Sequence, residues 1–145
     1  MSRASDAAAL VAQGKLNCAQ AVLAAFAAEL GLPRITALQI AQGFGGGMGR
    51  TGGICGAVSA SCMVLGLRPN AAPLDSPERR EELYRKVQGL KAQFEALHGS
   101  VMCPFLLGHD LSKPAERAAA RAEGVFQSVC PGLVEDAVTM LEALA

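Results

Sequence analysis

The sequence lacks several features on which whole classes of protein depend. It has no apolar run of the roughly 18 residues that a membrane-spanning helix needs, so we do not expect a membrane-embedded protein. The 13 basic and 13 acidic residues give a net charge of zero, and no basic stripe stands out. This balance argues against nucleic-acid binding. Strong β runs are also missing, which favours a helical fold.

Local motifs for metals, redox dithiols and phosphates are missing as well. No CxxC pair occurs, which removes the local signatures of zinc ribbons, thioredoxin-like sites and bacterial ferredoxins. The glycine-rich stretch does not end in the Gly-Lys-Ser/Thr of a Walker A loop. Residues 47–52 match GxGxxG, but without a preceding apolar strand the match does not indicate a dinucleotide site. Any cysteine site must therefore be assembled by the fold.

The residues that are present predict one helical domain. The chain has 145 residues, of which 51% are hydrophobic and 18% charged, which suits a single packed domain over residues 1–145. Its 27 alanines favour helix. We predict an all-α, compact bundle of about five to seven helices, with a Gly-rich loop leading into a central helix. The expected helices cover 3–13, 18–30, 36–42, 54–65, 77–98, a segment opening at Lys113–Pro114, and 132–144.

The longest expected helix, 77–98, has one apolar stripe. Ser76 is a good cap for it and Pro77 suits its first position. The stripe has a/d spacing and comprises Leu83, Val87, Leu90, Phe94 and Leu97. Such a stripe predicts a face packed on the core, with a homodimer seam as the alternative.

Four of the five cysteines fall where a helix is expected to begin. Unpaired N–H groups and the helix dipole at such a position stabilise a thiolate, which makes it a nucleophile or a metal ligand. The four are Cys18, Cys55, Cys103 and Cys130. The odd number of cysteines and a start unlike a signal peptide predict a cytoplasmic protein with reduced thiols. The alternative is that all five are small buried residues.

Cys62 differs from the other four cysteines. It follows Cys55 by seven residues on the same expected helix, which places it about 10 Å along the axis. That separation is beyond the reach of a disulfide. We therefore expect Cys62 to lie in the core.

The stretch from Gly43 to Cys55 reads GFGGGMGRTGGIC, and seven of the eleven residues from 43 to 53 are glycine. Glycine lets a backbone approach a sulfur closely and turn successive N–H groups inward. We predict that Gly53, Gly56 and the loop amides surround the Cys55 sulfur. A flexible linker is the alternative, and Arg50 is a candidate contact for an anionic substrate.

These segments resemble the redox-active protein family named for the motif C_GCAxxG_C_C. The matching stretches are NCAQAVL with Cys18, GGICGAVSA with Cys55, CPFLLGHDL with Cys103, and VCPGLVEDAVTMLEAL with Cys130. The last glycine of the family motif is Ala60 here, which affects helix packing more than the sulfurs. The resemblance covers nearly the whole chain and implies a redox role without defining a reaction.

Two chemical functions follow from the four cysteines. In the first, Cys18, Cys55, Cys103 and Cys130 bind an iron–sulfur cluster for electron transfer or redox sensing, or else a structural zinc ion. In the second, the protein is a metal-free dithiol/disulfide oxidoreductase with Cys55 as the reactive thiolate. Either needs a redox partner protein or a small-molecule oxidant or reductant. A helical interaction module is the third alternative.

Overall fold

Helices make up most of residues 2–144, the part of the chain that the computed structural model describes. Seven of them have nine residues or more: α1 (Arg3–Ala12), α2 (Cys18–Ala27), α3 (Arg34–Gln42), α5 (Gly56–Leu67), α6 (Pro77–His98), α8 (Pro114–Ala122) and α10 (Cys130–Ala143). Three are shorter: α4 (Gly45–Met48), α7 (Cys103–Leu107) and α9 (Val125–Ser128). The prediction of an all-α fold is confirmed.

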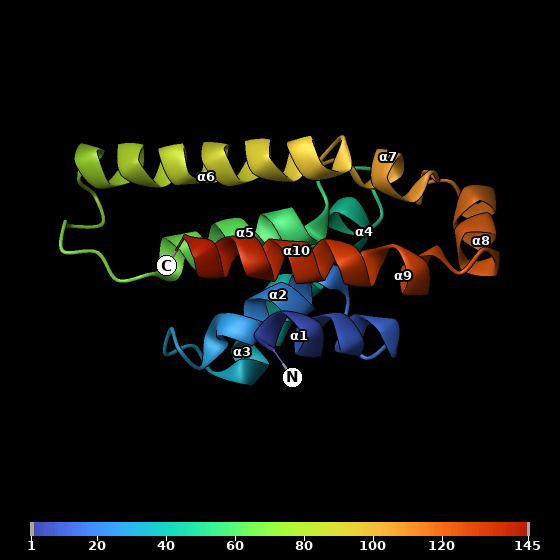
Figure 1. The fold of residues 1–145 in the computed structure, drawn as a ribbon, viewed down its shortest axis with the longest axis horizontal. Coiled ribbons are helices and arrows are strands. Elements are labelled where there is room, and N and C mark those ends of the chain that lie inside the picture. Colours follow the sequence, from blue (N-terminus) through green and yellow to red (C-terminus); the bar gives the residue numbers. More distant parts are fainter. Residues whose placement is uncertain (1, 145) are drawn as a thin grey trace.

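The long helices lie in three layers (Figure 1). Helix α6 forms one outer layer, α5 and α10 lie in the middle, and α1, α2 and α3 form the other side. Helix α2 packs on α5 through a surface that includes small buried residues such as Ala19 and Ala57. Small side chains let two helix backbones approach closely. The starts of α2 and α5, which carry two of the cysteines, therefore meet inside the fold.

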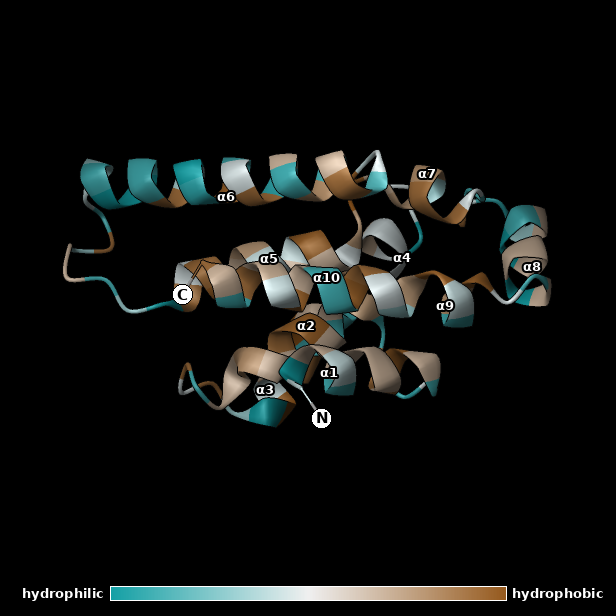
Figure 2. Cartoon of the chain, in the orientation of Figure 1, coloured by the Kyte–Doolittle hydropathy of each residue, from teal (hydrophilic) through white to brown (hydrophobic). Residues whose placement is uncertain are grey.

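Helix α6 contributes a narrow stripe to the core. Leu90 and Phe94 are buried, and Leu83 and Val87 are half-buried against the core, whereas Leu97 is 59% exposed. Figure 2 shows the hydrophilic colouring over much of the rest of this helix. The predicted core-facing stripe is confirmed except at Leu97, and the homodimer seam stays a prediction.

Several predicted helix boundaries were wrong. Helix α3 begins at Arg34 with Pro33 at its N-cap, not at Thr36. Helix α5 begins at Gly56 because Ile54 instead forms an isolated antiparallel bridge with Met102. At the other end of the chain, α10 begins two residues early, at Cys130 itself.

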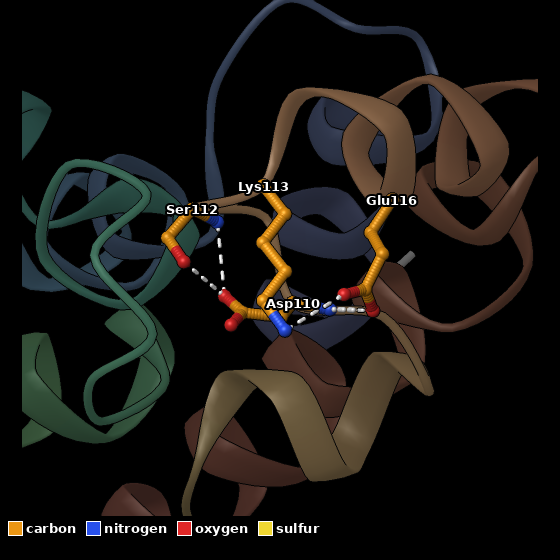
Figure 3. A network of polar contacts seen from close by, with 4 residues as sticks. All are labelled: Asp110, Ser112, Lys113 and Glu116. Atoms are coloured by element: carbon orange, nitrogen blue, oxygen red, sulfur yellow. Dashed lines mark hydrogen bonds and ion pairs between the residues drawn. The ribbon is translucent and has the colours of Figure 1, made fainter.

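The loop between α7 and α8 is held by its own polar groups (Figure 3). The Asp110 carboxylate accepts hydrogen bonds from the Ser112 N–H at 3.0 Å and from the Ser112 hydroxyl at 2.6 Å. The Asp110 N–H donates to Glu116 Oε1 at 2.9 Å, and Glu116 also pairs with Lys113 at 3.6 Å. This network fixes the turn that buries Leu111 beside Cys103.

None of the helices within residues 2–144 is both long enough and apolar enough to cross a bilayer.

Candidate functional site

The start of α2 is anchored from two directions. The Asn17 side chain accepts from the Gln20 N–H at 2.9 Å, and the Gln20 side chain accepts from the Asn17 N–H at 3.1 Å, which forms a capping box. The same two side chains donate to α3 carbonyls, Asn17 to Gln42 at 3.0 Å and Gln20 to Leu38 at 3.1 Å. Cys18, the first residue of α2, is therefore held at a capped and braced helix start.

The glycine-rich stretch is a folded cradle and not a flexible linker. It forms α4 and the turns around it, with left-handed backbone at Gly46, Gly47 and Gly49. A Cβ on Gly47 would lie 2.7 Å from the Gly53 carbonyl oxygen and 2.8 Å from Cys103 Cβ. Only glycine satisfies both the left-handed conformation and this close approach.

A short bridge places Cys55 next to the strand-like segment that leads into Cys103. The Cys55 N–H donates to the Val101 carbonyl at 2.7 Å, and the Cys103 N–H donates to the Gly53 carbonyl at 2.9 Å. These two bonds flank the bridge between Ile54 and Met102. The predicted site residue Gly53 thus positions Cys103 through its carbonyl, while Cys55 becomes the N-cap of α5.

Gly56 lies under the sulfur of Cys18. A Cβ at this position would meet Cys18 Sγ at 2.7 Å and the Phe44 carbonyl oxygen at 2.7 Å. Real Cβ atoms do not approach heavy atoms so closely. The sequence predicted that Gly56 serves the site; the sulfur that it faces is that of Cys18, from another helix.

Four cysteines line a single open cavity of about 570 Å³. Each starts or caps a helix, as predicted: Cys18 on α2, Cys55 on α5, Cys103 on α7 and Cys130 on α10. Cys62 does not line the cavity. It is half-buried in α5 and is not part of the hydrophobic core, so its predicted place in the core was wrong.

The hydrogen-bond donors around Cys18 favour a thiolate at that residue. The Cys55 thiol donates a hydrogen bond to the Cys18 sulfur and lowers its pKa from 9.0 to about 7, against the opposing effect of burial. Backbone N–H groups of Gly46, Ala19 and Ala57 lower the pKa further. The predicted amide cradle is therefore present, but the loop amide belongs to Gly46 and serves Cys18.

The other three thiols stay protonated near neutral pH. The pKa of Cys55 is raised well above 9.0, first because Cys55 donates to Cys18, then by burial and by the Cys18 charge. Burial, followed by that same charge, raises the pKa of Cys103 to about 11 and that of Cys130 to about 12. The prediction named Cys55 as the thiolate; these directions reverse the roles within the pair.

The predicted metal ligands do not form a metal-binding group in this arrangement. Across residues 2–144, no three Cys, His, Asp or Glu side chains are grouped closely enough to hold one ion. Cys18 is hydrogen-bonded to Cys55, whereas it affects Cys103 and Cys130 through its charge, which raises the pKa of both thiols after the larger effect of burial. As arranged here, the four cysteines do not form a site for a single zinc ion.

Fold and site together define an all-helical thiol protein with four helix-start cysteines around one cavity. The chain belongs to the family described as "Putative redox-active protein (C_GCAxxG_C_C)", whose sequence pattern matches residues 16–144. No curated protein and no solved structure matches the chain.

Sequence reasoning missed most of the cavity's basic residues. Lys15 and Arg121 line the cavity together with Arg50, which had been singled out. They come from the turn after α1, the end of α8 and the glycine-rich stretch. No local pattern relates residues so far apart in the sequence, so only the fold could bring them together.

Replacing Gly56 by alanine tests the contact under Cys18. We expect Gly56→Ala to lower the free energy of unfolding by about 1–3 kcal/mol, the usual cost of overpacking, and to raise the Cys18 pKa as the sulfur shifts. Gly89→Ala is the matched control, because nothing lies within 4 Å of a Cβ there. It should stabilise α6 by about 0.5–1 kcal/mol. Urea denaturation measures both, and equal stability of the two variants would contradict the contact.

The assignment of the thiolate is tested by the pH dependence of alkylation. We expect iodoacetamide to modify Cys18 first, with a rate that rises through about pH 7. Cys55→Ala should move that midpoint toward 9, because the thiolate loses its donor, whereas Cys55→Ser keeps a donor and should shift it less. Mass spectrometry identifies the modified residue. Preferential labelling of Cys55, or an unchanged midpoint in Cys55→Ala, would contradict the assignment.

Proposed function

We propose that this protein is a dithiol–disulfide redox protein in which Cys18 attacks a disulfide and Cys55 resolves the product. The observation that supports the proposal is one hydrogen bond, from the Cys55 thiol to the Cys18 sulfur, at the wall of an open cavity. Cys18 is partly accessible and carries the charge, whereas Cys55 is only 4% exposed. An accessible nucleophile beside a sheltered resolving thiol is the arrangement that such chemistry needs.

In the first step the Cys18 thiolate attacks one sulfur of a substrate disulfide. A bond forms between Cys18 and that sulfur, and the substrate S–S bond breaks, so that one substrate thiolate leaves. The lowered pKa increases the fraction of Cys18 present as thiolate near neutral pH by more than it lowers the intrinsic nucleophilicity of that thiolate, so the attack is accelerated.

In the second step Cys55 loses its proton to the departing thiolate and attacks the Cys18 sulfur. The mixed disulfide breaks, the second substrate thiolate leaves, and a Cys18–Cys55 disulfide forms. The protein dithiol is thereby oxidised by two electrons and the substrate disulfide is reduced to two thiols. An external thiol reductant, either a partner protein or a small molecule, then regenerates the dithiol.

Assigning attack to Cys18 follows from the donors around each sulfur. Cys18 receives hydrogen bonds from the Cys55 thiol and from the amides of two helix starts and the glycine cradle. Cys55 donates its proton to a hydrogen bond with Cys18. Loss of that proton would place two negative sulfurs side by side. Its pKa falls only after Cys18 has been consumed in the mixed disulfide, which is when the resolving step needs it.

The cluster alternative is kept for a different observation, the meeting of four cysteines at one cavity. Iron–sulfur ligation would use Cys18, Cys55, Cys103 and Cys130 as the four thiolate ligands. We also propose a cytoplasmic location, which suits reduced thiols.

Single serine variants test the exchange reaction with 2-hydroxyethyl disulfide as substrate. The reduced wild type should release two thiols per chain and gain a Cys18–Cys55 disulfide, located by peptide mapping. Cys18→Ser should abolish release, and Cys55→Ser should release one thiol and trap a mixed disulfide on Cys18. Cys62→Ser, outside the cavity, should behave as the wild type. Full activity in Cys18→Ser, or a disulfide between Cys103 and Cys130 instead, would overturn the proposal.

Anaerobic purification followed by iron, sulfide and zinc assays and an absorption spectrum decides between the candidates. Metal-free protein that forms the Cys18–Cys55 disulfide supports the dithiol proposal. A brown protein with near-stoichiometric iron and sulfide would replace it with the cluster. Stoichiometric zinc without colour would point to a structural site.

A further inference from the structure

The charged side chains that line the cysteine cavity are all basic, although the chain as a whole has a net charge of zero. Lys15, Arg50 and Arg121 line it, and none of its other described lining residues is an aspartate or a glutamate. All three basic side chains are exposed to solvent, as expected of groups at the mouth of a cavity. A ligand entering the cavity therefore passes three positive charges and no fixed carboxylate.

These three cations have no ionic partner of their own. Four of the ten other lysines and arginines in the described chain pair with carboxylates, as Arg3 does with Glu29 at 2.9 Å and Lys86 with Glu82 at 3.2 Å. No carboxylate among residues 2–144 lies within 4 Å of the charged groups of Lys15, Arg50 or Arg121. Asp110, which raises the Cys103 pKa from nearby, is engaged by Ser112 and does not line the cavity.

Arg50 occupies a backbone conformation that favours glycine. Its φ is +66°, and its Cγ lies only 2.8 Å from the position that a Cβ on Gly46 would take. The aliphatic part of the Arg50 side chain therefore packs against the glycine cradle beside Cys18. A large side chain at a left-handed position costs about 1 kcal/mol or more relative to glycine, so the charge is placed there against the local backbone preference.

One part of the remaining wall is apolar. It is formed by side chains that include Leu106, Leu107, Leu111, Phe126 and Leu133, and neutral amide side chains of asparagine and glutamine line another part. A volume of about 570 Å³ falls within the range of small-molecule sites. Apolar walls with a cationic mouth suit a compact molecule that has a hydrocarbon or sulfur centre and acidic ends.

From these features we propose that the cavity binds low-molecular-weight disulfides whose ends carry carboxylates. The apolar wall holds the central S–S bond beside Cys18, and Lys15, Arg50 and Arg121 hold the carboxylates. The redox step and its electron balance are those of the proposed function, on which this substrate class rests. The cations also offset the repulsion between an anionic substrate and the Cys18 thiolate, which would otherwise favour cationic disulfides.

A series of disulfides that differ in charge tests the proposal. The probes are 3,3′-dithiodipropionate (a dianion), 2-hydroxyethyl disulfide (neutral) and cystamine (a dication), each rate being divided by its rate with 2-mercaptoethanol. We expect the dianion to react about ten-fold faster than the neutral disulfide at low salt, and cystamine to react slowest. Half-molar salt should remove most of the difference. A flat or reversed order in the wild type would overturn the proposal.

Two triple variants separate the cavity charges from net charge. Lys15→Gln, Arg50→Gln and Arg121→Gln together should make the three rates similar or favour cystamine. Arg34→Gln, Arg80→Gln and Arg85→Gln make the same change in net charge at exposed positions outside the cavity, and should keep the preference for the dianion. Equal behaviour of the two triple variants would assign the preference to net charge and overturn the proposed site.

A third variant uses the strained backbone at Arg50. We expect Arg50→Gly to raise the melting temperature, because glycine accepts the left-handed conformation, and to lower the preference for the dianion. A merely structural Arg50 would leave that preference unchanged.

Binding without redox chemistry distinguishes failure of the substrate class from failure of the reaction. Octanedioate and 1,6-hexanediol replace the S–S bond of the dianion and of the neutral disulfide with two methylene groups. Octanedioate should shift the amide resonances of Gly46 and Gly56, hexanediol should not, and the cavity triple variant should lose the response. If no disulfide reacts but octanedioate binds in this way, the exchange proposal fails and the anion site stands. If disulfides react and octanedioate gives no shifts, the site fails alone.

Discussion

The contact between the Cys18 sulfur and the start of α5 is the constraint on which the site depends. The sulfur lies against Gly56, and it accepts hydrogen bonds from the Cys55 thiol and from backbone N–H groups of α2, α5 and the glycine cradle. These donors come from three separate segments of the chain. Three segments of the chain therefore meet at this sulfur. Residues around it are small because larger side chains would prevent that approach.

One negative charge organises the other sulfurs. The hydrogen bond to Cys18 raises the pKa of Cys55, and burial followed by the Cys18 charge raises the pKa of Cys103 and Cys130. Near neutral pH the four cysteines are therefore not equivalent: Cys18 is the nucleophile and the other three are protonated thiols. The same low pKa makes Cys18 a good leaving group, so a disulfide formed through it is readily reduced again.

The helical fold, the helix-start positions of four cysteines and the selection of Gly53 and Gly56 could be predicted from the sequence, because helix caps, prolines and glycines act on the backbone near them. It placed the thiolate on Cys55 because the glycine stretch precedes that residue in the chain. The cradle instead folds back, and its Gly46 amide reaches Cys18 from α2. Likewise, the cationic mouth joins Lys15, Arg50 and Arg121 from three elements. Such long-range contacts leave no periodic trace in a sequence, and neither does the half-exposed position of Cys62.

The bridge between Ile54 and Met102 ties two segments that the chain separates by α5, its following loop and the whole of α6. Together with the two adjoining backbone hydrogen bonds, it closes this long excursion at its base. The relative placement of Cys55 and Cys103 is consequently independent of the distal connection at residues 68–76. We expect this connection to tolerate a change of length, or an inserted reporter, because the relative placement of Cys55 and Cys103 does not depend on it.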